Sequence, residues 1–287
     1  MKRIYLDYAA ATPVDPRVKQ VILDYLAKGN ANPSGLYQEG IESKKYLESA
    51  RKIVASFIGA KSHEIIFTSS TTESNNLAIL GAARANRSNG QHLITTATEH
   101  VSVLNVFKQL EVEGFEVSYL PVDEYGRVSP DQIAKSIRPD TILVSVIFAS
   151  NEIGTINPIK EIGQVIKGIK GDKRGRNGLP YFFTDAAQAA PHLPINVNNL
   201  GIDLMSFSSS KIYGPKGAAA LYIKSGVKIG PVMFGGSQEN NLRPGTQDVA
   251  GLVGFAEAIK INQAEGPAED EQLKLWRDRI IKEVQSA

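Results

Sequence analysis

The sequence has no cysteine among its 287 residues, and it has no long apolar run. Without cysteine the chain can form no disulfide, no thiolate metal site and no cysteine nucleophile, which fits a reducing compartment. No window approaches about eighteen uninterrupted apolar residues, and the start MKRIYLDYAAATPVDP turns acidic and proline-rich too early for a signal peptide. We therefore predict a cytoplasmic protein that is not associated with a membrane.

An excess of charge of either sign is also lacking. Thirty-two Lys and Arg oppose thirty Asp and Glu, for a net charge of +2, and the basic residues are scattered along the chain. A surface that binds nucleic acid would be more basic, so we expect no nucleic-acid partner. With 42% hydrophobic residues the chain is long enough to form one large domain or two smaller ones.

Short apolar runs alternate with amphipathic helical patterns from about residue 60 onward. Several runs are apolar at every position, as in parallel strands that are buried on both faces. This alternation predicts an α/β fold with a mostly parallel seven-stranded sheet flanked by helices. The predicted strands are 64–69, 92–96, 115–120, 141–147, 181–185, 202–208 and 218–224, and the predicted helices are 16–27, 40–57, 73–85, 101–113, 130–137 and 158–170. After Ala250 the pattern is helical to the end, with a strongly amphipathic last helix at 269–287.

Common phosphate and metal motifs are absent from the sequence. Neither the dinucleotide pattern G-x-G-x-x-G nor the P-loop pattern G-x-x-x-x-G-K-[ST] occurs. The four histidines show no H-x-x-x-H spacing, so we expect no metal site. The candidates that remain are polar residues just beyond strand ends, where open α/β sheets bind ligands.

The first candidate is the stretch TSSTTESNN, residues 68–76, in which a predicted strand ends and a helix begins. Backbone N–H groups at that helix start, with the hydroxyls of Ser70, Thr71 and Thr72, could bind a phosphate. The same hydroxyls could simply cap the helix, and the spacing alone favours the cap.

Asp185 and Lys211 each follow a predicted strand directly. An aspartate in this place more often caps a turn, but it could hold a pyridinium nitrogen in its protonated form. A lone lysine is usually solvated, yet Lys211 has small, hydroxylated and turn-forming neighbours that could dock a phosphate and lower the pKa of its amine. Lysine, aspartate and a hydroxyl-lined helix start are the parts that a pyridoxal 5′-phosphate site needs.

Several motifs of the sequence together resemble a known family. The motifs that carry the resemblance run in order from residue 4 to about residue 260, and they are YLDYAAATPVDPRV, NPSGLYQEGIESKKYLESAR, EIIFTSSTTESNNLAI, TEHVSVLN, NEIGTINPI, DAAQAAPHLPINV, DLMSFSSSKIYGPKGAAALYIK and GGSQENNLRPGTQD. Together they are similar to the cysteine desulfurases of the NifS and IscS type, within the class V aminotransferases. The resemblance implies a pyridoxal-phosphate enzyme of fold type I that converts L-cysteine to L-alanine.

The resemblance implies a role for each matching residue. Lys211 would bond covalently to the cofactor aldehyde and later move the Cα proton of the substrate. Asp185 would pair with the pyridinium nitrogen and His100 would stack on the cofactor ring. Asn151 and Gln188 would lie near the ring oxygen and the substrate, although each could instead satisfy buried backbone groups.

The phosphate ligands follow from the same resemblance. Thr72 and Ser208 would hold the phosphate, beside Thr71 of the same helix start. Thr246 would reach the phosphate of a neighbouring subunit, which implies a homodimer. Ser210 stands where the family usually has histidine, so it offers a hydroxyl without the reach and possible charge of an imidazole.

The resemblance also predicts a division into domains. Residues 1–15 would join a small domain, residues 16–255 would form the cofactor-binding large domain, and residues 256–287 would begin an incomplete C-terminal small domain. The family's catalytic cysteine and its substrate-binding arginine lie in that domain, and we expect both to be missing from this chain.

Three hypotheses about function remain open. The chain is the cofactor-binding part of a cysteine desulfurase that passes sulfane sulfur to an acceptor or scaffold protein for iron-sulfur cluster or thio-cofactor assembly. Alternatively, it is another class V pyridoxal-phosphate enzyme, such as an aminotransferase or a selenocysteine or cysteine lyase. The third hypothesis is a noncatalytic scaffold that retains the fold.

Overall fold

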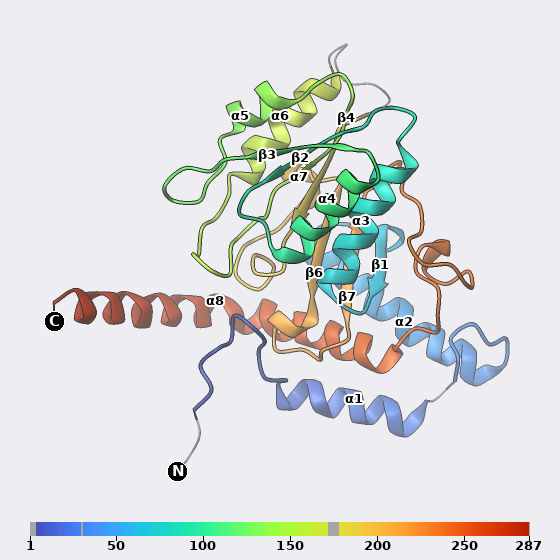
Figure 1. The fold of residues 1–287 in the computed structure, drawn as a ribbon. Coiled ribbons are helices and arrows are strands. Elements are labelled where there is room, and N and C mark those ends of the chain that lie inside the picture. Colours follow the sequence, from blue (N-terminus) through green and yellow to red (C-terminus); the bar gives the residue numbers. More distant parts are fainter. Residues whose placement is uncertain (1–3, 30, 172–177, 287) are drawn as a thin grey trace.

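A seven-stranded sheet forms the centre of the computed structural model, which describes residues 4–29, 31–171 and 178–286 (Figure 1). The strand order is β1-β7-β6-β5-β4-β2-β3, and only β7 runs against its neighbours. The predicted α/β fold with a mostly parallel sheet is therefore confirmed. The strands are β1 (Ile65–Thr68), β2 (His92–Thr96), β3 (Glu116–Leu120), β4 (Thr141–Ser145), β5 (Tyr181–Asp185), β6 (Leu204–Ser208) and β7 (Ala219–Ile223).

Two helices, α3 (Thr71–Ala85) and α4 (Val101–Val112), cover one face of the sheet, and the other long helices cover the opposite face. The remaining helices are α1 (Pro16–Lys28), α2 (Gln38–Phe57), α5 (Pro130–Ser136), α6 (Ile159–Gly171), α7 (Val197–Leu200) and α8 (Val249–Gln285), with 3₁₀ turns η1 (Ser62–Glu64), η2 (Ser209–Lys211) and η3 (Glu239–Asn241). Each predicted helical pattern falls on one of the α-helices. The site residues lie where the strands of this sandwich end.

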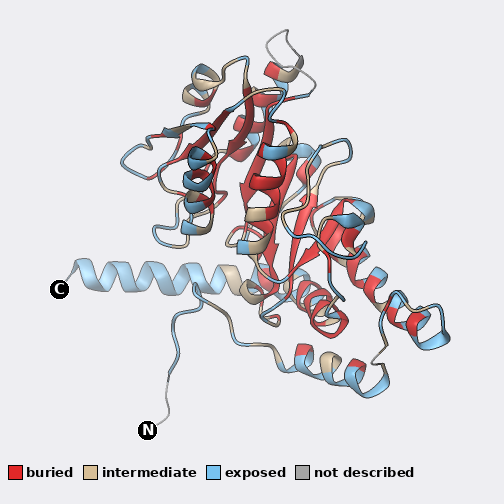
Figure 2. Cartoon of the chain, turned by 45° about the vertical axis from the view of Figure 1, so that its right-hand side comes forward, coloured by how far each residue is buried: buried red, intermediate tan, exposed pale blue. Residues whose placement is uncertain are grey.

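The central strands are buried on both faces because their side chains alternate between two apolar clusters. On β4, Leu143 packs toward α3 and α4 whereas Val144 packs toward the opposite layer, and Phe183 and Phe182 of β5 divide in the same way. Figure 2 shows this buried centre in red. At the edge of the sheet, β3 has a mixed pattern of exposure, and β7 is buried except for its last residue, Ile223. Burial on both faces explains why the strands read as continuous apolar runs rather than as alternating ones.

Helix α8 begins at Val249, in agreement with the helical pattern predicted after Ala250, and it contains the predicted amphipathic segment 269–287 as far as Gln285. Its first turns are buried through Leu252, Phe255 and Ile259, and they pack against α1 and α2. Its second half projects from the molecule and is exposed (Figures 1 and 2). The exposed part carries an apolar stripe at helical spacing, formed by Leu273, Trp276, Ile280 and Ile281. The predicted domain boundary at residue 255 therefore falls inside one continuous helix.

The N-terminal segment docks on the loop that follows β6. The backbone N–H of Thr12 donates to the Ser210 carbonyl at 3.0 Å, and that of Asp15 donates to the Tyr213 carbonyl at 2.9 Å. These bonds place the residues before α1 beside Lys211, although they are about two hundred positions away in the sequence. Within the described part of the chain, no helix is both long enough and apolar enough to cross a membrane.

Candidate active site

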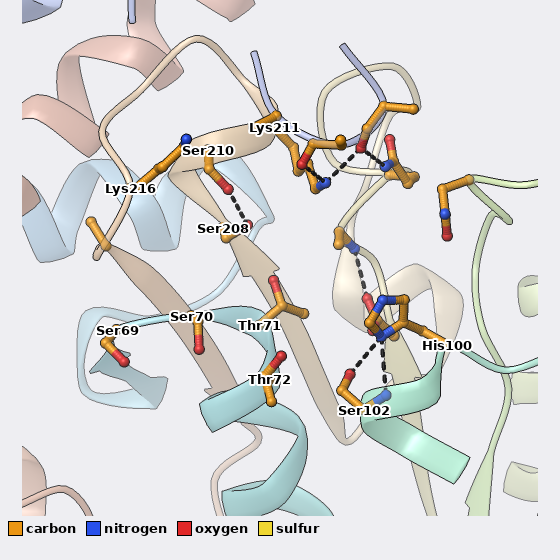
Figure 3. A pocket seen from close by; sticks show the side chains of 18 of the residues that line it. Ser69, Ser70, Thr71, Thr72, His100, Ser102, Ser208, Ser210, Lys211 and Lys216 are labelled. Atoms are coloured by element: carbon orange, nitrogen blue, oxygen red, sulfur yellow. Dashed lines mark hydrogen bonds between the residues drawn. The ribbon is translucent and has the colours of Figure 1, made fainter. Parts of the chain in front are cut away.

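A cavity of about 460 Å³ lies at the carboxyl ends of the central strands (Figure 3). This is the edge at which open parallel sheets bind ligands. Nine of the ten predicted site residues line it, and these are Thr71, Thr72, His100, Asn151, Asp185, Gln188, Ser208, Ser210 and Lys211. The tenth, Thr246, is exposed and does not line this cavity. The fold therefore gathers residues from five separate segments into one place.

The start of α3 forms the hydroxyl-rich side of the cavity. Ser70 is the N-cap, and its side chain accepts the backbone N–H of Glu73 at 3.1 Å. Ser70, Thr71 and Thr72 also line the cavity, so the capping and the ligand-facing interpretations of TSSTT both hold. Helix α3 begins at Thr71, two residues before the prediction, because the cap is this serine. A helix N-terminus with neighbouring hydroxyls is suited to bind a phosphate.

Lys211 ends the short η2 turn after β6. Its Nζ atom donates to the carbonyl oxygens of Ala9 and Ala10, at 2.6 Å each. Burial lowers the pKa of this amine, and the negative charges of Asp185 and Asp7 oppose that shift. The turn itself requires glycine at position 214, because a Cβ atom there would lie 1.9 Å from Ser209 Oγ. Tight local packing thus holds Lys211 at the cavity wall. Its lowered pKa means that its charged form is less favoured than that of an ordinary lysine.

Asp185 ends β5 and is only 4% exposed. Its Oδ1 atom accepts the backbone N–H of Ala187 at 3.0 Å, and its Oδ2 atom accepts the side-chain N–H of Asn75 at 2.9 Å. Burial raises the pKa of the carboxyl, and these two hydrogen bonds and the charges of His100 and Lys211 act against the rise. The carboxylate is therefore held in place while it faces the cavity.

Three further predicted residues combine structural and ligand-facing positions. His100 is the N-cap of α4, and its Nδ1 atom accepts the backbone N–H of Ser102 at 3.1 Å (Figure 3). Gln188 donates to the Ala9 carbonyl at 2.9 Å, and Asn151 donates to Glu152 at 2.6 Å. All three line the cavity as well. The alternative roles considered from sequence, capping and satisfying backbone groups, thus hold in part without removing these residues from the site.

Sequence reasoning missed several residues around the cavity. Ala9, Ala10 and Ala11 line it through the docked N-terminal segment. Ser102 lines it as well, and it accepts a hydrogen bond from Asn75, which lies behind the cavity. All five stand inside motifs that were recognised, namely YLDYAAATPVDPRV, EIIFTSSTTESNNLAI and TEHVSVLN. Their participation depends on tertiary contacts that no local pattern specifies.

Glu99 was also missed. Its Oε1 atom accepts the backbone N–H of Ile147 at 2.6 Å and the Thr96 hydroxyl at 3.0 Å, while Oε2 is buried without a hydrogen-bond partner in the described residues. Burial raises the pKa of this carboxyl to about 8, opposed by the two hydrogen bonds and assisted by the charge of Asp185. Glu99 is consequently mostly protonated at pH 7, whereas the ionised form of Asp185 is favoured by its two hydrogen bonds and opposed by burial, which raises the pKa of that carboxyl.

We expect replacement of Glu99 by glutamine to flatten the dependence of stability on pH. Between the ordinary carboxyl pKa of 4.5 and about 8, the folded state holds a proton that the unfolded chain has released. Stability therefore falls as pH rises through this window, by up to about 1.4 kcal/mol per pH unit. Urea unfolding at pH 5, 6.5 and 8 measures the free energy of unfolding of both proteins. As pH rises, that of the variant should increase relative to that of the wild type. Parallel stability curves for the two proteins would contradict a neutral Glu99.

The residues around the cavity fit pyridoxal 5′-phosphate. The buried Asp185 carboxylate can accept a hydrogen bond from the ring N–H of the cofactor. The lowered pKa of the Lys211 amine favours its neutral form, which can attack the carbonyl carbon of an aldehyde. The start of α3 offers hydroxyls and N–H groups to a phosphate. Such an aspartate and lysine, at the ends of neighbouring strands β5 and β6 of a mostly parallel sheet, define the class of fold type I pyridoxal-phosphate enzymes.

Comparison with known proteins narrows this class. The family model for class V aminotransferases matches residues 4–282. The cysteine desulfurase IscS of Dictyoglomus turgidum is 48% identical over 286 residues, which are 99% of this chain and 70% of that protein. Among solved structures, a NifS-like protein superposes with a TM-score of 0.93 at 35% identity, covering 99% of this chain and 76% of that one. SspA, solved in complex with cysteine, superposes with a TM-score of 0.83 at 38% identity, covering 90% of this chain and 72% of that one.

The chain belongs to the class V aminotransferase family, among its cysteine desulfurases of the NifS and IscS type. Enzymes of this group depend on pyridoxal 5′-phosphate. The resemblance drawn from the sequence motifs is thereby confirmed, and so is the expected cofactor.

Proposed function

We propose that this chain binds pyridoxal 5′-phosphate and L-cysteine in the cavity, and that it supplies the cofactor-binding and proton-transfer part of a cysteine desulfurase. The observation that carries this proposal is the placement of the Lys211 amine and the buried Asp185 carboxylate in one cavity. The overall reaction would convert L-cysteine to L-alanine and deliver sulfane sulfur. SspA, which this chain resembles, was solved with cysteine bound, and this supports cysteine as the substrate.

Each residue has a defined part in this proposal. When bound, the cofactor supplies an electron sink next to the Cα atom of the substrate. Lys211 forms the covalent attachment to the cofactor and moves the Cα proton, a task for which a lowered pKa is suitable. Asp185 keeps a proton on the pyridine nitrogen, and His100 packs against the ring.

The remaining polar residues of the cavity bind the two ends of the ligand. Thr71, Thr72, Ser208 and Ser210 hold the phosphate. Asn151 and Gln188 lie near the ring oxygen and the substrate. Because Ser210 is a hydroxyl where the family usually has an imidazole, the positive field at this phosphate arises from the N-terminus of α3.

The sulfur acceptor lies outside these 287 residues, because they include no cysteine. The chain spans about 70% of the length of the IscS relative from Dictyoglomus turgidum. We propose that a thiol from elsewhere receives the sulfur, and that an acceptor or scaffold protein for iron-sulfur cluster or thio-cofactor assembly takes it onward.

We further propose that the active form is a cytoplasmic homodimer. Thr246 is exposed and does not line its own cavity, which leaves it available to the phosphate of a second copy. Its loop is rigidly anchored: Glu239 and the two residues after it have left-handed backbone conformations, and Arg51 binds the buried Glu239 carboxylate through two bonds of 2.7 and 2.8 Å. A rigid loop can present Thr246 in a fixed position to a partner subunit.

The product of cysteine turnover tests the proposal. The purified chain, supplied with pyridoxal phosphate, L-cysteine and dithiothreitol as thiol acceptor, should release sulfide together with an equal amount of alanine. Lys211→Ala should form neither product. Pyruvate in place of alanine would indicate a lyase that eliminates the sulfur, and absence of any product despite cofactor binding would favour the noncatalytic scaffold.

A further inference from the structure

A buried amide behind the cavity, that of Asn75, connects the two residues expected to face the cofactor ring. Asn75 lies in the second turn of α3, is 0% exposed and does not line the cavity. Its Nδ2 group donates to Asp185 Oδ2 at 2.9 Å and to Ser102 Oγ at 2.8 Å. Its Oδ1 atom accepts the Ser206 hydroxyl at 2.6 Å. Every hydrogen-bonding direction of this amide except one lone pair is therefore in use.

The orientation of the amide follows from its partners. An ionised Asp185 can only accept hydrogen bonds, so Asn75 must present N–H to it and its carbonyl to Ser206. A flipped amide would place two oxygens against each other at the carboxylate. The Asp185 carboxylate thus fixes which side of Asn75 faces it, and the Ser206 hydroxyl on β6 donates to the amide oxygen on the other side.

The second N–H of the Asn75 amide connects it, through Ser102, to His100. Ser102 Oγ accepts from Asn75 and directs its own hydrogen to His100 Nδ1, at 2.8 Å. The backbone N–H of Ser102 also donates to Nδ1. Because Nδ1 is an acceptor of both bonds, the neutral imidazole carries its proton on Nε2. One amide is therefore common to the hydrogen-bond networks of Asp185 and His100.

We propose that Asn75 is a positioning residue that keeps the Asp185 carboxylate ionised and correctly oriented for the pyridine nitrogen of the cofactor, and couples it to His100. The proposal rests on the proposed function for the identity of the ligand, but not for the effect on the carboxylate. Asp185 receives two hydrogen bonds, from Ala187 and Asn75, and loss of either leaves a buried charge with a single donor.

The charges around Asp185 do not replace this hydrogen bond. His100 and Lys211 favour the ionised form from the cavity side, while burial acts against it. Asn75 is the contact that α3 makes to the carboxylate, and no other element supplies a side-chain donor to it in the described part of the chain. Removal of the amide should therefore shift the balance toward a protonated Asp185.

The test is the titration of Asp185 in cofactor-free protein, followed by ¹³C NMR with labelled aspartate. We expect Asn75→Ala to raise the titration midpoint of Asp185 by about one to two pH units, the shift that corresponds to one hydrogen bond to a charged group. The matched control is Asn76→Ala, since Asn76 is the next residue on α3 and bonds only the Thr72 carbonyl. The control should leave the midpoint unchanged.

A second variant guards against loss of folding. Ser206→Ala removes only the hydroxyl that donates to the amide oxygen and so helps to hold the amide in place, and it should raise the midpoint in the same direction by a smaller amount. Near-ultraviolet circular dichroism would establish which variants are folded. A wild-type midpoint in Asn75→Ala, or in Ser206→Ala if Asn75→Ala does not fold, would overturn the proposal.

Cofactor titration separates this proposal from the proposed function. With pyridoxal phosphate added, Asn75→Ala should bind about tenfold or more weakly than the wild type and Asn76→Ala equally well. In ¹⁵N-labelled cofactor, the pyridine nitrogen resonance should move toward its unprotonated position in Asn75→Ala. If the wild type fails to bind the cofactor while the Asp185 midpoint still shifts, the proposed function fails and the role of Asn75 toward the carboxylate stands.

Discussion

Replacement of Lys211 by alanine should abolish both the covalent attachment of pyridoxal phosphate and the turnover of L-cysteine. In the wild type, we expect a visible absorbance band on addition of the cofactor and, after borohydride, a modified peptide that contains Lys211. The variant should lack both. Its turnover should fall by at least about 10²–10⁴-fold, because the group that moves the Cα proton is lost along with the anchor.

Lys216 is the matched control for this experiment. It lines the same cavity but is exposed, and it follows the same strand as Lys211 (Figure 3). Lys216→Ala should keep the absorbance band and the borohydride-trapped peptide. If the absorbance band is present in Lys211→Ala and absent in Lys216→Ala, then Lys216, and not Lys211, is the residue that attaches the cofactor.

Replacement of Asp185 by asparagine should reduce turnover by about 10²–10⁴-fold while the protein stays folded. Asparagine has nearly the same shape, but it cannot carry the negative charge that holds a proton on the pyridine nitrogen. Because the carboxylate is buried, its removal also removes a desolvation cost, so the free energy of unfolding should be unchanged or higher. Steady-state kinetics and urea unfolding of the same sample measure both effects.

Asp203 offers a control with a different expected outcome. It is another buried aspartate of this sheet, beside the amino end of β6, where it binds Lys170 and the backbone N–H of Phe182. Asp203→Asn should lower stability and leave the spectrum of the bound cofactor unchanged. If Asp185→Asn turns over cysteine at the wild-type rate, the assignment of Asp185 as the pyridine partner is wrong.

Most of the sheet could be predicted from the sequence because burial on both faces leaves a strong local signal. The runs HLITT and YFFTD coincide with β2 and β5 at both ends, and the other five contain their strands. Boundaries shifted where a terminus depends on a single cap, as at Ser70 before α3. The start of α8 at Val249 agrees with the helical pattern that was expected after Ala250, and its exposed second half carries the amphipathic pattern.

The site could be predicted only in part. Asp185 and Lys211 were found because each directly follows a strand, and neighbouring parallel strands bring such residues to one edge. The carbonyl groups of Ala9 and Ala10 could not be found in this way, since a backbone oxygen has no residue-specific signature and lies some two hundred positions from Lys211. Glu99 and Asn75 look like ordinary polar residues until burial gives them fixed partners.

The sequence by itself determined the fold class, the family and the cofactor, and it indicated the residues that we propose contact this cofactor. These depend on periodic burial and on co-linear motifs, both of which are local properties of the chain. Only the tertiary structure decided the ionisation of the site, through the burial of Glu99 and the amide of Asn75 that joins Asp185 to His100. Protonation depends on desolvation and on partners from distant segments, and those exist only once the chain is folded.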